Sequence, residues 1–208
     1  MRDVLICDFG GVLTTPLQAG FLAYQEEAGL SLEELGSAMA RAAEEHGENP
    51  LFALERGEIT ESELWGGVQR HVGGGFDLTR LRELFFERLL PNTPMIEFVR
   101  ELRGRDVRAA LLTNNVREWE PLWRGKLPEV EELFDVIVDS AFVGLRKPDP
   151  AIYTLTLERL GGVESERCVF VDDVELNCDT ARELGMEALR FESAEQAIPE
   201  LERAFLRN

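Results

Sequence analysis

Long apolar runs are missing from this sequence of 208 residues, and so is the pattern of a secretion signal. No run approaches the ~18–20 consecutive apolar residues that a membrane-spanning helix requires, so none is predicted. The N-terminal residues MRDVLICDFGG lack the apolar stretch and the cleavage site of a signal peptide. They are better suited to a β-strand, and we expect a cytoplasmic protein.

Cysteines and basic residues are scarce. The three cysteines are odd in number and have no metal-type spacing, so we expect them to be reduced and buried. The chain has 22 basic against 40 acidic residues and a formal charge of −18. A surface this acidic repels nucleic acid and anionic membranes, so we expect neither as a partner. Any phosphate ligand therefore needs a local cation, either a lysine or a metal ion.

Four short apolar runs indicate strands, because none of them alternates with polar residues. Continuous apolar runs separated by helical stretches are typical of parallel strands that are buried on both faces. A fifth, weaker run at residues 188–191 is compatible with an edge strand. The four stronger runs are residues 4–7, 109–112, 136–138 and 168–171.

A helical insert separates the first two predicted strands. Residues 16–90 read as successive helices, and capping-box spacings at Ser31 with Glu34 and at Thr60 with Glu63 mark two of their starts. The remaining residues alternate between strand and helix. The sequence therefore predicts an α/β fold, a Rossmann-like parallel sheet with helices inserted after the first strand.

Polar residues follow each predicted strand, where an open parallel sheet binds its ligands. Side by side, these strands would bring three carboxylates, a hydroxyl and an ammonium group around one cavity. Clustered carboxylates repel one another unless a cation intervenes, and hard oxygen ligands suit Mg²⁺. A carboxylate beside Mg²⁺ can attack phosphorus and form an aspartyl-phosphate. The strand ends are Asp8, Thr113 with Asn114 and Asn115, Asp139 with Ser140 followed by Lys147, and Asp172 with Asp173. The three carboxylates are Asp8, Asp172 and Asp173, the hydroxyl is Thr113, and the ammonium group is Lys147.

Four motifs in this order resemble the haloacid dehalogenase-like hydrolase superfamily over nearly the whole chain. They are LICDFGGVLTT around Asp8, LLTN with Thr113, RKPDPAIY with Lys147, and FVDDVELN with Asp172 and Asp173. The insert after the first motif is similar to the helical C1 cap of that family. The segment ERGEIT is similar to a cap segment in its phosphatase subgroup, which includes sugar-1-phosphate phosphatases. The N-terminal domains of epoxide hydrolases also look related.

The resemblance implies a Mg²⁺-dependent phosphatase of a small phosphorylated metabolite. It implies a core of residues 1–15 and 91–208 and a C1 cap of residues 16–90. Oligomeric state stays open. The implied roles are Asp8 as nucleophile and metal ligand, Thr113, Asn114 and Lys147 as phosphate-binding groups, and the Gly10 carbonyl and Asp173 as metal ligands with Asp172 nearby.

Gly10 departs from the family pattern, which has a second aspartate two residues after the nucleophile. The carbonyl remains for a metal, but the acid that protonates the leaving group is absent. Besides the phosphatase, the sequence leaves two other hypotheses open. One is a metal-independent dehalogenase that uses Asp8 on carbon, against which Asp172 and Asp173 argue. The other is a catalytically weak binding or regulatory domain, which only Gly10 supports.

Several residues outside the motifs have plainer interpretations. Arg56 in the ERGEIT segment is expected to be solvated rather than to face substrate. Asn177, one helical turn after Asp173, either orients that carboxylate or is a surface amide. Four aromatic residues are expected to build core. They are Phe85, Phe86, Trp119 and Trp123.

Overall fold

The computed structural model describes residues 2–28, 30–72 and 77–206. Within them, five strands form one parallel sheet in the order β3-β2-β1-β4-β5. The predicted apolar runs became β1 to β4, and the weaker run became the edge strand β5, so the predicted α/β fold is confirmed. The strands are β1 (Val4–Cys7), β2 (Arg108–Thr113), β3 (Val136–Asp139), β4 (Cys168–Asp172) and β5 (Glu187–Arg190).

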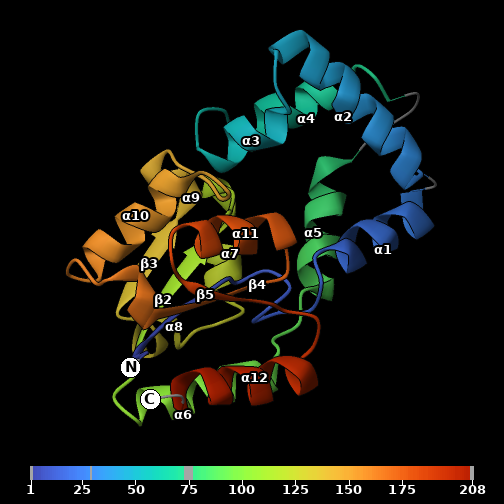
Figure 1. Cartoon of the computed structure of the whole chain (residues 1–208). Helices are drawn as coiled ribbons and strands as arrows, with labels where there is room; N and C mark the ends of the chain where they lie inside the picture. The colour runs from blue at the N-terminus through green and yellow to red at the C-terminus, as the bar shows by residue number, and fades with distance from the viewer. Residues whose placement is uncertain (1, 29, 73–76, 207–208) are drawn as a thin grey trace.

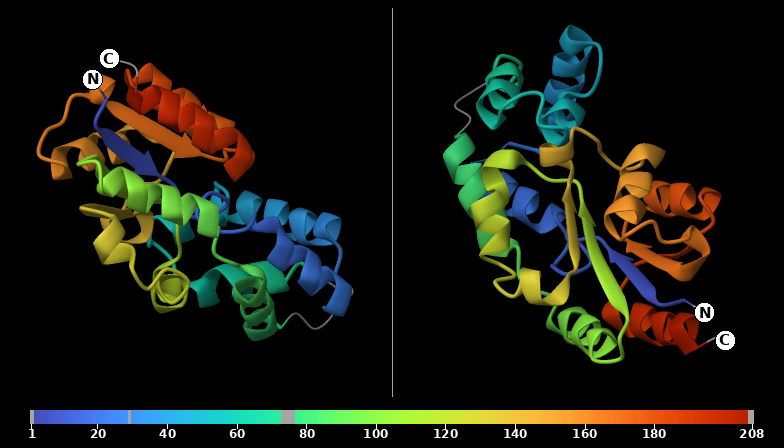
Figure 2. Two further views of the ribbon diagram at one scale, coloured as in Figure 1. Left: turned by 90° about the horizontal axis from the view of Figure 1, so that it is seen from below. Right: turned by 90° about the vertical axis from the view of Figure 1, so that its left-hand side faces the viewer.

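Both faces of the sheet are buried, which explains the continuous apolar runs. Successive side chains of β1 enter opposite faces: Leu5 and Cys7 belong to one hydrophobic cluster, and Val4 and Ile6 belong to another. Helices α6 (Thr93–Arg103) and α12 (Ala194–Leu206) cover the first face, while α10 (Pro150–Arg159) and α11 (Glu175–Glu183) cover the second (Figure 2).

Short helices connect these layers. These short helices are η1 (Arg117–Trp119), α7 (Glu120–Arg124), α8 (Val130–Leu133), α9 (Ser140–Val143) and η2 (Ser165–Arg167).

The helices predicted between the first two strands form a group of their own beside the sheet (Figure 1). Both predicted capping boxes are present, at Ser31 with Glu34 and at Thr60 with Glu63. A third hydrophobic cluster holds most of this group together. The helices of the group are α1 (Gln18–Ala28), α2 (Leu32–His46), α3 (Pro50–Glu55), α4 (Glu61–Gln69) and α5 (Leu78–Arg88).

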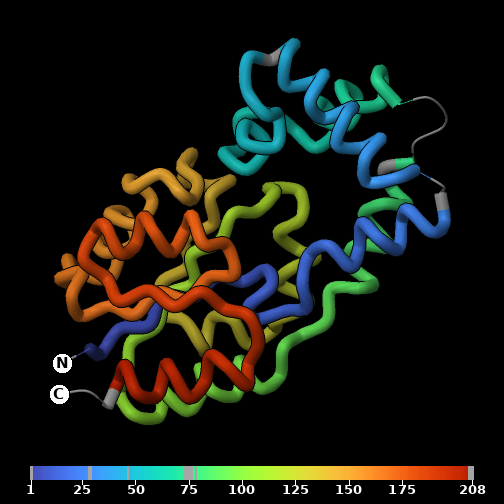
Figure 3. The backbone as a smooth tube through the Cα atoms, turned by 45° about the vertical axis from the view of Figure 1, so that its right-hand side comes forward, coloured from blue at the N-terminus to red at the C-terminus, as the bar shows by residue number. Residues whose placement is uncertain are grey.

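Two adjacent chain segments connect this group to the sheet (Figure 3). Thr14 and Pro91 form an isolated antiparallel bridge, and Thr15 N–H donates to the Leu90 carbonyl at 2.8 Å. The insert therefore leaves and re-enters the core at one place, close to the end of β1.

The cysteines are buried and form no disulfide. Among the described helices, none has the length and apolar character needed to cross a membrane.

Candidate active site

The parallel register brings the ends of three strands together. Cys7 pairs with Leu111 on one side and with Val171 on the other, so the residues that follow them meet at one edge of the sheet. A cleft at this edge is lined by five of the seven predicted site residues. Of the other two, Thr113 lines the adjoining cavity and Asp172 is fully buried. The five in the cleft are Asp8, Gly10, Asn114, Lys147 and Asp173.

The ammonium group of Lys147 is the centre of this cluster. Its Nζ lies 2.8 Å from Asp8 Oδ1 and 2.6 Å from Asp172 Oδ2, and the side chain is only 1% exposed. Burial alone would lower the pKa of Lys147, but the two carboxylates together raise it above its ordinary value. Lys147 is therefore a fixed positive charge between two buried carboxylates.

Asn114 positions the backbone of that lysine. Its side-chain Nδ2 donates to the Lys147 carbonyl at 2.9 Å, and its Oδ1 accepts the Lys147 N–H at 2.8 Å. Both ends of the Asn114 amide are thus occupied by one residue of a distant loop. This links the end of β2 to the loop that supplies the ammonium group.

Asp172 is held from several directions. Its carboxylate accepts from Asn177 Nδ2 at 2.9 and 3.1 Å and from the Val174 N–H at 2.9 Å, besides its contact with Lys147. Asn177 is itself held by Tyr153, whose hydroxyl donates to the Asn177 carbonyl at 3.0 Å. Neither interpretation of Asn177 was right, because this buried amide supports Asp172 rather than Asp173.

Asp8 and Asp173 are the carboxylates that face the cleft. Burial raises the pKa of Asp8 to about 7, although the charge of Lys147 pulls it down. Burial and then the charge of Asp172 raise the pKa of Asp173.

Gly11 lies against the Asp173 carboxylate on one side of the cleft. Its φ is +77°, and an added Cβ would lie 2.4 Å from Asp173 Oδ2. Only glycine allows this approach of the chain to the carboxylate.

The cluster fits a hard divalent cation. Asp8, Asp172 and Asp173 each offer an oxygen, and these atoms lie within 4.8 Å of one another. Three carboxylates and the one ammonium group of Lys147 leave a formal excess of two negative charges. Burial is the main cause of the raised pKa values of Asp8 and Asp173, and the charge of Asp172 adds to it, so a bound cation would favour the ionised form of both groups. An oxygen donor set of this kind suits Mg²⁺.

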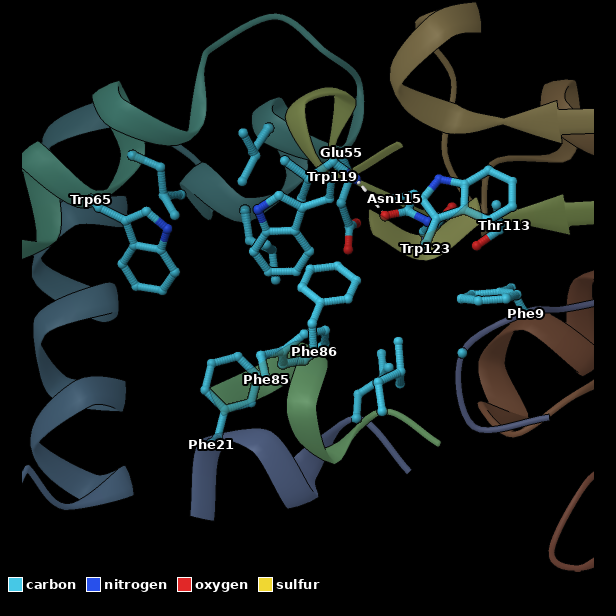
Figure 4. A pocket seen from close by; sticks show the side chains of 18 of the residues that line it. Phe9, Phe21, Glu55, Trp65, Phe85, Phe86, Thr113, Asn115, Trp119 and Trp123 are labelled. Carbon is cyan, nitrogen blue, oxygen red and sulfur yellow. Dashed lines mark hydrogen bonds between the residues drawn. The ribbon is translucent and has the colours of Figure 1, made fainter. Parts of the chain in front are cut away.

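A second, apolar cavity of about 370 Å³ adjoins the cleft (Figure 4). The four aromatic residues expected to build core do pack in it: Phe85, Phe86 and Trp123 are buried, and Trp119 is partly buried. They also line this cavity, which the sequence did not indicate.

Sequence reasoning also missed the pair formed by Glu55 and Arg146. Glu55, the last residue of α3, places Oε2 2.6 Å from Arg146 Nε, and both side chains are less than one-fifth exposed. Burial raises the pKa of Glu55 against the pull of Arg146. Arg56, the neighbour considered instead, pairs with Glu48 and Glu58 away from the cleft. The available signal in the sequence was the position of Arg146 directly before the motif lysine, Lys147, which places Arg146 near the site.

Comparison with known proteins agrees with this geometry. The family model described as haloacid dehalogenase-like hydrolase matches residues 3–185. Rat bifunctional epoxide hydrolase 2 is 28% identical over 94% of this chain and 37% of its own length. A sesquiterpene phosphatase from Aspergillus oryzae is 28% identical over 89% of this chain and 88% of its own. The chain spans only 10% to 37% of the length of the mouse, rat and pig proteins that it matches.

The fold is shared with solved enzymes. A HAD family enzyme from Bacteroides thetaiotaomicron, in complex with magnesium and inorganic phosphate, superposes with a TM-score of 0.67 at 23% identity. The match covers 93% of this chain and 96% of that one. At 23% identity, this structural similarity shows only that the fold is shared. The family is shown by the family model, which matches most of the sequence. The chain therefore belongs to the haloacid dehalogenase-like hydrolases.

Proposed function

We propose that the chain is a Mg²⁺-dependent phosphomonoester hydrolase that acts on a small phosphorylated metabolite through an aspartyl-phosphate. The observation that carries this proposal is the contact of Lys147 Nζ with Asp8 Oδ1 at 2.8 Å, in a cleft shared with Asp173. A carboxylate with a fixed ammonium beside it and a cation site next to it suits attack on an anionic phosphoryl group. The names of the relatives, among them a phosphatase, support the same activity.

Asp8 is the proposed nucleophile. Its carboxylate oxygen forms a bond to phosphorus as the bond from phosphorus to the ester oxygen breaks, and the leaving oxygen takes up a proton. Water then attacks the phosphorus of the aspartyl-phosphate, which releases phosphate and restores the Asp8 carboxylate. Lys147 and Thr113 hold the phosphoryl oxygens during both steps. Asn114 is the third proposed phosphate-binding group, and its side chain also positions the backbone of Lys147.

The proposed metal ligands are Asp8, the Gly10 carbonyl and Asp173. Asp172 lies beside them, but Lys147, Asn177 and Val174 already occupy its oxygens. When bound, Mg²⁺ would neutralise part of the phosphoryl charge and act as a Lewis acid.

We further propose the division of the chain into a core of residues 1–15 and 91–208 and a helical cap of residues 16–90. The Thr14–Pro91 bridge at the proposed boundary supports it. Cap residues such as Glu55 line the cleft, so the cap would enclose the substrate.

Hydrolysis of 4-nitrophenyl phosphate with Mg²⁺, with EDTA and with Asp8→Asn tests the proposal. We expect EDTA and Asp8→Asn each to abolish turnover with the fold retained, whereas the exposed Asp149→Asn leaves it unchanged. Activity that EDTA does not affect would overturn the metal assignment. Near-wild-type turnover in Asp8→Asn would overturn the covalent step. Halide release from a 2-haloacid would favour the dehalogenase hypothesis.

A further inference from the structure

The apolar cavity lies between the inserted helices and the end of the sheet (Figure 4). Aromatic rings from the insert, including Phe21, Trp65 and Phe85, line one part of it, and Phe9 and Trp123 line the part nearest the sheet. Its volume of about 370 Å³ is within the range of pockets that take small molecules, roughly 300–1,000 Å³.

The cavity continues from the phosphate cleft. Gly10, Leu17, Glu55 and Asn114 line both spaces, and Thr113 lies on the wall of the cavity. A phosphoryl group placed beside Asp8 would therefore direct its ester oxygen, and whatever that oxygen carries, toward the aromatic walls. The cavity is thus the natural place for the leaving group.

Few polar groups line the cavity, and several of them are already engaged. Asn114 is held by Lys147, Asn115 Oδ1 accepts the Val116 N–H, and Glu55 is paired with Arg146. The indole of Trp119 donates to Glu61 Oε1 at 2.8 Å, so it offers the cavity only its ring. A sugar has more hydroxyl groups than this mostly apolar lining has polar partners, and each hydroxyl buried without a partner costs about 1–3 kcal/mol.

We propose that the substrate is an amphipathic phosphomonoester whose alcohol is an aromatic or long-chain apolar group seated in this cavity. The inference rests on the proposed phosphatase function for its anionic end and on the cavity for its apolar end. Within the small phosphorylated metabolites proposed above, the inference selects those with an apolar alcohol and disfavours phosphorylated sugars.

Phenyl phosphates with 4-methyl, 4-butyl and 4-octyl groups test the apolar end, since lengthening the alkyl group leaves the acidity of the phenol almost constant. We expect kcat/KM to rise about two- to fourfold per added methylene until the cavity is full. Glucose 1-phosphate should be a poorer substrate than 4-butylphenyl phosphate. A series that is flat with chain length would overturn the inference.

A matched pair of glycine variants locates the effect. Gly36 of α2 lies one helical turn from Leu32 and Met39, which also line the cavity. An added Cβ at Gly36 or at Gly66 of α4 meets no atom within 4 Å, but Gly66 does not line the cavity. We expect Gly36→Phe to lower the ratio of kcat/KM for 4-octylphenyl phosphate to that for acetyl phosphate at least tenfold. Gly66→Phe should leave the ratio unchanged, and equal effects would contradict the assignment.

Fluorescence separates this inference from the phosphatase proposal. All three tryptophans of the chain line the cavity, so their emission reports its occupation without catalysis. Below its micelle concentration, dodecylphosphonate should shift this emission and bind at least 100-fold more tightly than methylphosphonate. Such binding without hydrolysis of any phosphate would refute only the proposed function. Hydrolysis of acetyl phosphate without chain-length-dependent binding would refute only the apolar substrate class.

Discussion

The buried ammonium group of Lys147 contacts two of the three carboxylates in the site. Lys147→Met would leave Asp8 and Asp172 without their cation and the phosphoryl group without a donor. We expect kcat/KM to fall by about 10²–10³ and the free energy of unfolding by about 3–5 kcal/mol. Steady-state kinetics and urea unfolding measure the two effects.

The control is Lys126→Met, because Lys126 is the only other lysine in the chain. It lies in the turn after α7 and lines neither cavity. If both variants lose activity equally, the role given to Lys147 is wrong.

Gly11 is the glycine that lets the loop after β1 approach Asp173. Gly11→Ala would place a Cβ 2.4 Å from Asp173 Oδ2 and displace that carboxylate. We expect the Mg²⁺ concentration at half-maximal activity to rise about 10–100-fold. Gly144→Ala is the matched control, since Gly144 also has a positive φ, +71°, but an added Cβ there meets nothing within 4 Å. An equal change in both variants would mean that backbone strain, and not Asp173, is responsible.

Gly10 stands where the family pattern has an acid, so the leaving oxygen should depend on its own acidity. We expect kcat/KM to rise steeply along a series of aryl phosphates with increasingly acidic phenols, and alkyl phosphates to be cleaved more slowly. An added Cβ at Gly10 would lie 3.1 Å from a Leu17 methyl group, and Leu17 is 41% exposed. Gly10→Asp combined with Leu17→Ala should therefore accept the acid and flatten the series.

Leu17→Ala alone is the control for that experiment, because it opens the same space without adding an acid. A flat series in the wild-type protein would show that another group donates the proton. Glu55, which lines the cleft and whose pKa is raised by burial, would then be the first candidate.

At the scale of elements, the end of β3 contains a buried carboxyl group, Asp139, outside the cluster around Lys147. Asp139 caps α9 by accepting the Ala141 N–H at 3.1 Å. Burial raises the pKa of Asp139 from 3.8 to about 6. The folded state therefore holds this proton more tightly than the unfolded state, and stability is lost as pH rises from about 4 to about 6.

Asp139→Asn keeps the cap and removes the ionisation. We expect its stability relative to the wild-type protein to improve by about 2–3 kcal/mol between pH 4 and pH 7, measured by urea unfolding. Asp149→Asn is the control, because Asp149 caps α10 in the same way but is exposed. If the free energy of unfolding changes with pH in the same way in the wild-type protein and in Asp139→Asn, the pKa of Asp139 is not raised by burial.

At the scale of the whole molecule, the pair formed by Glu55 and Arg146 ties the insert to the core beside the cleft. Arg146 also lies over the ring of Phe52 from α3, 4.0 Å from its centroid. We expect Glu55→Gln to raise KM about tenfold, with kcat changed less, because the insert would close over the substrate less often. Glu58→Gln is the control, since Glu58 pairs with Arg56 within the insert and is half exposed. A large effect of Glu58→Gln would show that the pair closing the cleft lies elsewhere.

Local patterns were sufficient for the elements. The apolar runs predicted the strands because both faces of the sheet are buried, and the spacing of Ser31 with Glu34 predicted the start of α2 because a capping box involves four consecutive residues. The polar residues at the strand ends could be placed at one edge as soon as the strands were taken to be parallel.

What only the tertiary structure decided involves residues far apart in the chain. Helical spacing left Asn177 either beside Asp173 or on the surface, but the turn after β4 brings its buried amide to Asp172. Glu55 and Arg146 are separated by 91 residues, and no local pattern pairs them. The apolar cavity has the same origin, because an aromatic residue that packs in a core and one that lines a cavity follow the same apolar pattern. Their difference is set by how closely the inserted helices approach the sheet, and that is a property of packing.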